Sequence, residues 1–495
     1  GKLALGGSAI SYCTYKALPL NRQQDLKGLA NSSVNAVFAT QVVGACVVDY
    51  IWGLRGLVFL SEEYHKKRNE IHTRCAKRIL KLSERTRGVY FKAGQYIGNL
   101  ERIMPKEYTD ILKVLQDSAP PLSYEEIKVV LESDMPEFFD QIEYIEENAM
   151  AAASLAQVHR AKLKTGEAVA VKIQYPFLTT QTIGDFKVIK QLTRACNYLL
   201  KVYNYQDIDL LKLWATFSEM CTKETDFLFE MQNAELTREQ YRGDSKVHIP
   251  GFYKKLCCKR VLTMEFVNGI KVSDIDRLKD EGYDFAELSE LLLTTFAKMI
   301  FETGHVHCDP HPGNILVRRN TQGDIQLVLL DHGFYREMSP KFCLIFCDMW
   351  RALVKFDYKR VRELSDMLGI GEYYRYLPLV LTYRTINSNK KLGELLTKEE
   401  KHSLHASNEI TFEKISRLLQ LLPPEIMFII RTSNLVAMHS LKLSGSLRRR
   451  FQVYTDYALW RLTGGGVAYW WEKLKFWMNL FLFELGWHKP SLPTC

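Results

Sequence analysis

The stretch FETGHVHCDPHPGNILV, residues 301–317, decides what kind of fold the rest of the chain must support. It places three histidines, an aspartate and an asparagine directly before an apolar strand. Such a set is typical either of a metal-ligand cluster or of the catalytic loop of a phosphoryl-transfer enzyme. Asp309 and Asn314 are five residues apart, on a loop in which Pro310 and Pro312 disfavour helix. In protein kinases an Asp and an Asn at this spacing act as base and magnesium ligand.

Two further pieces of sequence favour phosphoryl transfer. Asp331 follows in LLDHG, after two strand-like segments, NILVRR and DIQLVLL, joined by the hairpin signal NTQG. Upstream, VAVKIQ puts Lys172 on a strand shortly after AAASLAQVHRA, an order typical of a phosphate-covering loop and a phosphate-binding lysine. A metal site built from His305, His307 and His311 would need a second close-spaced ligand pair, and the sequence supplies none. The pattern therefore predicts a nucleotide site.

Composition and charge set the class of protein. The chain has 495 residues, 47% of them hydrophobic, which is enough for a sizeable core and more than one domain. The net charge of +9 favours an anionic partner such as nucleotide phosphates or lipid head groups, although a mildly basic solvated surface explains it equally well. Nothing indicates nucleic-acid binding. Eleven scattered cysteines without a CxxC motif indicate free thiols in a reducing compartment.

The hydrophobic pattern predicts an α+β fold with a small β-rich lobe followed by a larger helical lobe. Ser123 and Glu126 are expected to start a helix as a capping box. We predict five segments: an N-terminal membrane-proximal segment 1–60, a helical extension 61–141, an N-lobe with a helical insertion 142–268, a C-lobe 269–450, and an aromatic amphipathic helix 451–495.

Both ends of the chain carry possible targeting or membrane signals. Residues 1–24 are basic and lack acids, as in the remainder of an organellar import region. Residues 34–54 approach the length of a membrane span, but Gln41 and Asp49 interrupt them, which favours a buried or membrane-surface helix. Residues 464–487 are helical in pattern and rich in Trp and Phe, which predicts an interfacial or docking helix.

Seven motifs resemble those of the UbiB family of aarF-domain, ABC1-type atypical kinase-like proteins, over roughly residues 85–445. They are KAGQ (92–95), LQDSAPP (115–121), AAAS (151–154), VAVKIQYP (169–176), KETDFLFEMQN (223–233), CDPHPGN (308–314) and DHG (331–333). The details are most similar to the mitochondrial aarF-domain kinase 1 branch. The resemblance implies a bilobal kinase-like fold that binds ATP with magnesium, and a KxGQ helical extension covering the pocket where a protein substrate would sit.

Each expected site residue has a role. Lys172 needs a carboxylate beside it, and Glu230 is the first choice, with Glu224 as the second. If Glu230 pairs with Lys172, Glu224 and Asp226 are left to pair with Lys92. The expected catalytic residues are Asp309, Lys172, Lys92 and Gln95. The expected ATP-binding residues are Ala151, Ala152, Ala153, Ser154, Lys172, Glu230, Glu265 and Val267, and the expected metal ligands are Asn314 and Asp331.

Three departures from ordinary kinases bear on the reaction. DHG replaces DFG, the HVHCD loop lacks an Arg before its Asp, and no A-P-E segment follows within the next thirty residues. The leading interpretation is therefore an ATPase or small-molecule kinase at the mitochondrial inner membrane, supporting ubiquinone or lipid homeostasis. The alternative is a catalytically silent scaffold of a mitochondrial membrane complex, and a serine/threonine protein kinase ranks last.

Overall fold

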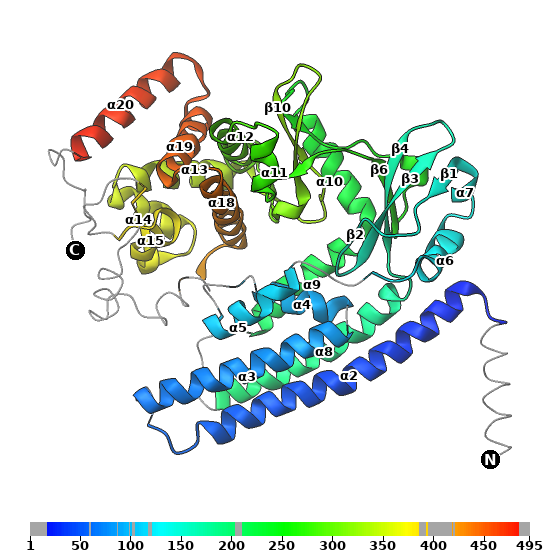
Figure 1. The fold of residues 1–495 in the computed structure, drawn as a ribbon. Helices are drawn as coiled ribbons and strands as arrows, with labels where there is room; N and C mark the ends of the chain where they lie inside the picture. Colours follow the sequence, from blue (N-terminus) through cyan, green and yellow to red (C-terminus); the bar gives the residue numbers. More distant parts are fainter. Residues whose placement is uncertain are drawn as a thin grey trace, which may run out of the picture. The chain divides into compact units, whose positions relative to one another are not determined.

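The computed structural model describes most of the chain, and its elements are drawn in Figure 1. The described residues are 17–58, 61–86, 88–98, 100, 104–116, 121–202, 210–385, 393, 394, 418 and 421–484. They group into two compact units: unit 1 is Gly1–Met231 with Gly251–Phe266, and unit 2 is Gln232–Pro250 with Val267–Cys495. Most of the expected import region, the APP break and the chain beyond 484 lie outside the described residues.

Unit 1 combines long helices with one sheet. Its helices are α2 (Leu20–Gly53), α3 (Glu62–Thr86), α4 (Gly88–Gly98), α5 (Lys106–Leu112), α6 (Tyr124–Asp134), α7 (Phe138–Gln141), α8 (Leu178–Val202), α9 (Leu210–Glu224) and the start of α10 (Phe227–Gln240), with 3-10 turns η1 (Lys113–Gln116) and η2 (Lys254–Leu256). Helices α3 and α8 both pack along α2 (Figure 1). The capping box predicted at Ser123 forms, since its hydroxyl accepts from the amide of Glu126.

Helix α2 passes the length and composition test for a membrane span, the one helix of the described residues that does so (Arg22–Gly53, mean hydropathy 1.5). Its polar side chains nevertheless bind neighbouring helices. Asn35 contacts Asp185 of α8 at 3.4 Å, and Asp49 pairs with Arg78 of α3 at 2.5 Å. These contacts tie α2 to α8 and α3 within unit 1.

The sheet of unit 1 is antiparallel, with the order β1-β3-β4-β6 and β2 paired to β3. Its strands are β1 (Ile142–Ile145), β2 (Ala151–Ala152), β3 (Ala156–Leu163), β4 (Ala168–Gln174) and β6 (Val261–Glu265). Alternation along β4 directs Val169, Val171 and Ile173 into the core beneath α6. Ala170 lies on the opposite face with Phe227 of α10, and Lys172 follows it on that face.

Unit 2 is mostly helical around a buried hairpin. Its strands are β5 (Val247–His248), β7 (Ile270–Lys271), β8 (His305–His307), β9 (Ile315–Arg319), β10 (Ile325–Leu329) and β11 (Tyr335–Glu337), arranged as β5-β10-β9-β7 and β11-β8. Its helices are α11 (Ile275–Asp280), α12 (Phe285–Ala297), α13 (Pro340–Val354), α14 (Tyr358–Met367), α15 (Leu377–Thr382), α18 (Pro424–Lys442), α19 (Leu447–Thr463) and α20 (Gly466–Glu484). Shorter turns are the π-helix η3 (Lys298–Thr303) and the 3-10 turns η4 (Pro312–Asn314) and η5 (Gly371–Tyr376).

The C-terminal segment differs from the single helix predicted for 451–495. Helix α19 starts at Leu447, before that boundary, and it ends at Thr463. Gly464 then takes a left-handed conformation (φ 71°), which suits glycine and ends the helix before α20 begins at Gly466. The predicted boundary at 451 was therefore wrong, whereas the helix predicted over 464–487 forms as α20.

Candidate functional site

Lys172 and Glu230 form a largely buried ion pair in unit 1. The side chain of Lys172 points from β4 toward α10, where Glu230 lies one turn beyond Phe227. The Lys172 Nζ is 2.8 Å from both carboxylate oxygens of Glu230, and the two side chains are 14% and 4% exposed. The ammonium also lies 5.1 Å from the Phe227 ring centroid. The predicted pairing of Lys172 with Glu230, rather than Glu224, is therefore confirmed; its role in ATP binding stays a prediction.

The alanine stretch forms a tight hairpin. Ala151 and Ala152 pair with β3, and the amide of Ala153 donates to the carbonyl of Ala156 at 2.8 Å. Ser154 is buried, and the Tyr175 hydroxyl donates to the Ala153 carbonyl. These backbone and hydroxyl contacts within a few residues hold the loop in one shape.

Glu265 and Val267, the other expected ATP-binding residues, belong to different units. Glu265 ends β6 in unit 1, where its carboxylate accepts from the amide of Gly251 at 3.2 Å. Val267 is buried in unit 2 against Leu316 and Val328. The structure therefore gives both residues a structural contact, and their place in an ATP site stays a prediction.

Helix α4 carries the KAGQ motif and binds Glu224 through Lys92. The Lys92 Nζ is 2.7 Å from Glu224 Oε2, and the side chains are 17% and 12% exposed. This contact confirms the predicted ion pair.

Gln95 of α4 donates to the carbonyl of Leu115 at 2.8 Å, so its amide holds α4 to η1. A side chain at Gly94 would clash with Leu115 and Ser83, which explains why the motif needs glycine there. Cover of a substrate pocket by α4 stays a prediction.

In unit 2 one hairpin brings the two expected metal ligands together. Asn314 directly precedes β9 and Asp331 follows β10, and the register pairs Ile315 with Leu329. The Leu330 amide donates to the Asn314 carbonyl at 2.9 Å, so both ligands lie at the same end of the hairpin. Both residues are partly exposed. An amide oxygen and a carboxylate that a ligand can reach suit Mg²⁺, a hard cation that prefers oxygen donors.

Asp309 reaches the same region through a second strand pair. Strand β8 pairs with β11, matching His307 to Tyr335, and the Cys308 amide donates to the carbonyl of Phe334 at 3.0 Å. This pairing places the CDPHPGN loop beside the DHG segment. The loop differs from the prediction in one respect, since Pro312–Asn314 form a turn of 3-10 helix. Proline fits the first position of such a turn, where no amide donor is required.

His332 fixes the DHG segment by hydrogen bonds, where ordinary kinases use a packed Phe. Its Nε2 lies 3.0 Å from the Leu329 carbonyl, and its Nδ1 lies 2.9 Å from the Tyr335 hydroxyl. Asn233 donates to the His332 carbonyl at 3.0 Å. Burial lowers the pKa of His332 to about 3, so the ring is neutral and one nitrogen accepts while the other donates. These bonds hold Asp331 in place, and its Oδ1 accepts from the Gly333 amide at 2.9 Å.

The remaining histidines of the opening stretch have structural contacts. The rings of His305 and His307 stack on Tyr335, with centroids 4.4 and 4.9 Å away. His307 Nδ1 accepts from the Asp309 amide, and His311 Nδ1 accepts from the Gly313 amide, each at 3.2 Å. Burial lowers the pKa of His307. Histidine thus shapes this loop through packing and through backbone hydrogen bonds.

Sequence reasoning missed Arg431, which contacts the expected catalytic base. Arg431 projects from α18, and its Nη2 is 2.9 Å from Asp309 Oδ1. The cation stabilises the ionised carboxylate and fixes its orientation. No spacing rule links two residues 122 positions apart, so no sequence signal indicated this pair.

His439, also on α18 and 7% exposed, gives unit 2 a pH-dependent stability. Burial lowers its pKa to about 4. The ring is therefore neutral in the folded chain, whereas an unfolded histidine takes up a proton as the pH falls through about 6.5. Stability is then lost on acidification between these values. From pH 7 to pH 5 this group should cost about 2 kcal/mol of unfolding free energy.

Denaturant unfolding of parent and His439→Gln at pH 7 and pH 5 checks this prediction. Because glutamine does not titrate, the variant should lose about 2 kcal/mol less than the parent between the two pH values. Equal losses in both proteins would show that His439 is protonated when folded.

The fold and these contacts define a kinase-like protein: an antiparallel sheet carrying a Lys–Glu pair, followed by a helical unit with an Asp-x4-Asn loop and a DHG aspartate. The comparison with protein families is decisive. Residues 114–365 match the ABC1 atypical kinase-like domain. The chain belongs to this ABC1/UbiB family, as its motifs indicated, and has the α+β kinase-like fold expected for it.

Curated relatives support the assignment over most of the chain. AarF domain-containing protein kinase 1 of Mus musculus is 35% identical over 81% of this chain and 76% of its own length. The Drosophila melanogaster AarF domain-containing kinase 1 is 35% identical over 76% of this chain and 72% of its own length. A probable serine/threonine-protein kinase abkD of Dictyostelium discoideum is 34% identical over 80% of this chain and 57% of its own.

Among solved structures, the Rv3197–erythromycin complex from Mycobacterium tuberculosis is 19% identical, with a TM-score of 0.46, and covers 78% of this chain and 97% of that one.

Proposed function

We propose that the chain is an ATP-binding enzyme that hydrolyses ATP or phosphorylates a small molecule. In this proposal Lys172, held by Glu230, contacts the nucleotide phosphates, Asn314 and Asp331 hold Mg²⁺, and Asp309 receives a proton from the attacking group. The observation that carries it is the pair of oxygen donors, Asn314 and Asp331, placed at one end of the β9–β10 hairpin. A bound Mg²⁺ would supply charge neutralisation of the phosphates.

The hairpin around the alanines supports a nucleotide pose that differs from that of ordinary kinases. Glycines in a phosphate-covering loop let the backbone take unusual dihedral angles, and alanine does not. Here β2 and β3 hold the Ala151–Ala152 pair in an extended conformation. The proposal therefore includes a fixed phosphate cover. It also includes a substrate smaller than a folded protein, because the KAGQ helix is expected to cover the substrate pocket, even though a relative is named a probable serine/threonine-protein kinase.

A catalytically silent scaffold is the second candidate, and one contact favours it. Arg431 is ion-paired with Asp309 Oδ1. If Asp309 acted as the proton acceptor, this oxygen would be expected to face the substrate. The presence of the buried Lys172–Glu230 pair favours the enzyme hypothesis. A scaffold does not need these two buried charges, because apolar side chains could replace them at little cost in stability.

We further propose the mitochondrial inner membrane as its location and ubiquinone or lipid homeostasis as its context. The support is the similarity of HCDPHPGN and LLDHG to the mitochondrial aarF-domain kinase 1 branch. An anionic membrane surface or a membrane protein complex would then be its partner, consistent with the net charge of +9.

Nucleotide binding should depend on divalent metal. We expect the affinity for ATP to fall at least about tenfold when EDTA replaces Mg²⁺, because the phosphates then face the Asp331 carboxylate without a bridging cation. Titration calorimetry measures this, with AMP as the control ligand that lacks the bridged phosphates. Equal ATP affinity in EDTA and in Mg²⁺ would contradict the proposed site.

A further inference from the structure

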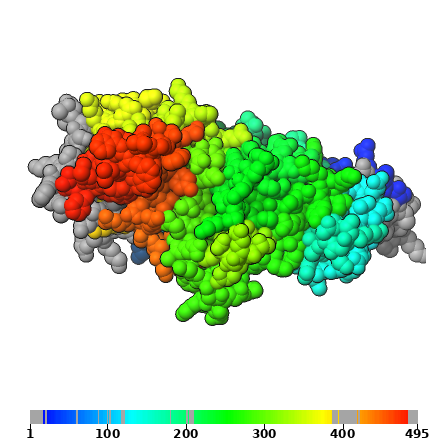
Figure 2. All heavy atoms as spheres, turned by 90° about the horizontal axis from the view of Figure 1, so that it is seen from above, coloured from blue at the N-terminus to red at the C-terminus, as the bar shows by residue number. Residues whose placement is uncertain are grey.

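Helix α20 exposes one continuous apolar face. The large apolar side chains that are more than half exposed along it are Val467, Trp470, Trp471, Leu474, Met478 and Phe481. Their spacing of three, four and seven residues places all six on one side of the helix, over a length of about 21 Å. We call this set the α20 stripe. Figure 2 shows α20, in red, at the surface of the molecule.

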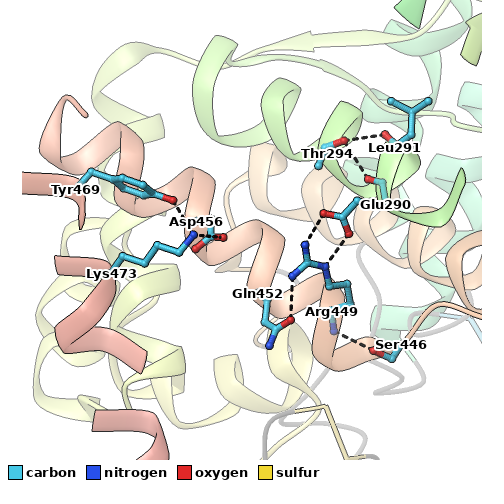
Figure 3. A network of polar contacts seen from close by, with 9 residues as sticks. All are labelled: Glu290, Leu291, Thr294, Ser446, Arg449, Gln452, Asp456, Tyr469 and Lys473. Atoms are coloured by element: carbon cyan, nitrogen blue, oxygen red, sulfur yellow. Dashed lines mark hydrogen bonds and ion pairs between the residues drawn. The ribbon is translucent and has the colours of Figure 1, made fainter. Parts of the chain in front are cut away.

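The opposite side of α20 is attached to unit 2 by polar and apolar contacts. Lys473 Nζ lies 2.9 Å from Asp456 of α19 and 3.0 Å from the Tyr469 hydroxyl (Figure 3). Phe476 and Leu480 are buried on the same side. The inner side of α20 therefore combines the Lys473–Asp456 ion pair with buried apolar side chains, while the stripe faces solvent, where an ordinary surface helix has polar residues.

Helix α19 is itself held firmly, so the stripe is presented on a fixed support. Arg449 of α19 makes a bidentate contact with Glu290 of α12, at 2.7 and 2.6 Å (Figure 3). Trp350 of α13 also donates to Thr455 of α19 at 3.2 Å. The Lys473–Asp456 ion pair ties α20 to this support with the stripe facing outward. A continuous exposed apolar surface of this kind marks an interaction site.

The lysines that lie beside two tryptophans of the stripe indicate what kind of partner α20 binds. Lys475 Nζ lies 5.0 Å from the Trp471 ring and Lys473 Nζ lies 5.4 Å from the Trp470 ring. Tryptophan beside ammonium groups at the border of an apolar face is typical of a membrane–water interface. Lys475 pairs with Glu472 at 3.3 Å, but its side chain stays 43% exposed at the border of the stripe, where it can reach an anionic head group.

We propose that α20 lies in the plane of an anionic lipid bilayer, with the stripe in the acyl boundary and Lys475 at the level of the lipid phosphates. The inference deepens the proposed membrane association and involves no nucleotide chemistry. Vesicle binding is measured without nucleotide, so the absence of vesicle binding would leave the ATP proposal untouched. Absence of ATP binding would likewise leave the membrane proposal untouched.

Co-sedimentation of the full chain with vesicles tests the proposal. We expect binding to phosphatidylcholine vesicles that contain phosphatidylglycerol and weaker binding to phosphatidylcholine alone. Leu474→Glu should weaken binding about tenfold or more, because it puts a charge into the inserted face. Met367→Glu is the matched control, since Met367 of α14 is equally exposed at 60% but lies outside the stripe; it should bind like the parent. Circular dichroism confirms that both variants are folded.

Two results would overturn the proposal. If Leu474→Glu is folded and binds the anionic vesicles as tightly as the parent, another surface carries membrane binding. The second result is a parent protein that binds neither type of vesicle and forms a dimer in light scattering. If Leu474→Glu abolishes that dimer, the stripe is a protein interface. A Lys475→Gln variant that binds both vesicle types equally would add support, because it isolates the attraction to the anionic lipid.

Discussion

Asp331→Asn is expected to lower metal-dependent ATP turnover at least about a hundredfold, the largest effect we predict for any single substitution. The change removes the negative charge that would face Mg²⁺ in the proposed site and keeps the side-chain oxygen. The hydrogen bond from the Gly333 amide to Asp331 Oδ1 can therefore persist, and the DHG segment should stay folded. Phosphate release in Mg²⁺ measures the turnover, and thermal unfolding measures the fold.

Asp324→Asn is the matched control for that experiment. Asp324 lies in the exposed turn of the same hairpin, at the end away from Asn314 and Asp331. The Asp324→Asn substitution removes one carboxylate from the same hairpin without changing the proposed metal ligands, so ATP turnover should stay at the parent value. A folded Asp331→Asn protein that hydrolyses ATP like the Asp324→Asn control would exclude a metal-holding role for Asp331.

Glu230→Gln is expected to lower the unfolding free energy by about 3 kcal/mol, because it leaves the largely buried Lys172 ammonium without its carboxylate. Lys172→Met in the Glu230→Gln background should recover part of this loss, since the uncompensated charge is then gone. A double-mutant cycle in urea should give a coupling energy of about 1–3 kcal/mol.

The ion pair between Lys162 and Glu143 provides the control in the same sheet. Its side chains are 37% and 48% exposed, so water and salt screen the charges. Glu143→Gln should leave stability unchanged within error. If Glu230→Gln proves as harmless as Glu143→Gln, the Lys172 pair is solvated in solution and cannot act as the fixed phosphate-binding lysine.

Much of the fold was predictable because short-range patterns specify it. The period-two run around Lys172, the NTQG turn and the capping box at Ser123 each predicted the element that forms. The Lys172–Glu230 and Lys92–Glu224 pairs were also predicted, because the resemblance to the UbiB family implied that both lysines are covered and a buried ammonium needs a carboxylate.

Other features depend on tertiary contacts that no local pattern specifies. Arg431 meets Asp309 only because α18 packs near the β8 end, where Thr432 donates to the His307 carbonyl at 3.0 Å. The hydrogen bond from the Gln95 amide to the Leu115 carbonyl depends on the close approach of Leu115 to α4 at Gly94, and the catalytic role expected for Gln95 stays a prediction. An interfacial or docking helix was predicted over 464–487, but the helical pattern did not specify which apolar residues of α20 would lie on its exposed side.

ATP hydrolysis by the purified chain tests the central claim most directly, measured with and without anionic vesicles. We predict Mg²⁺-dependent turnover that rises when vesicles are present and disappears in Asp331→Asn. A folded parent protein that shows no turnover in either condition, or turnover that Asp331→Asn leaves intact, would contradict the enzyme proposal and favour the scaffold.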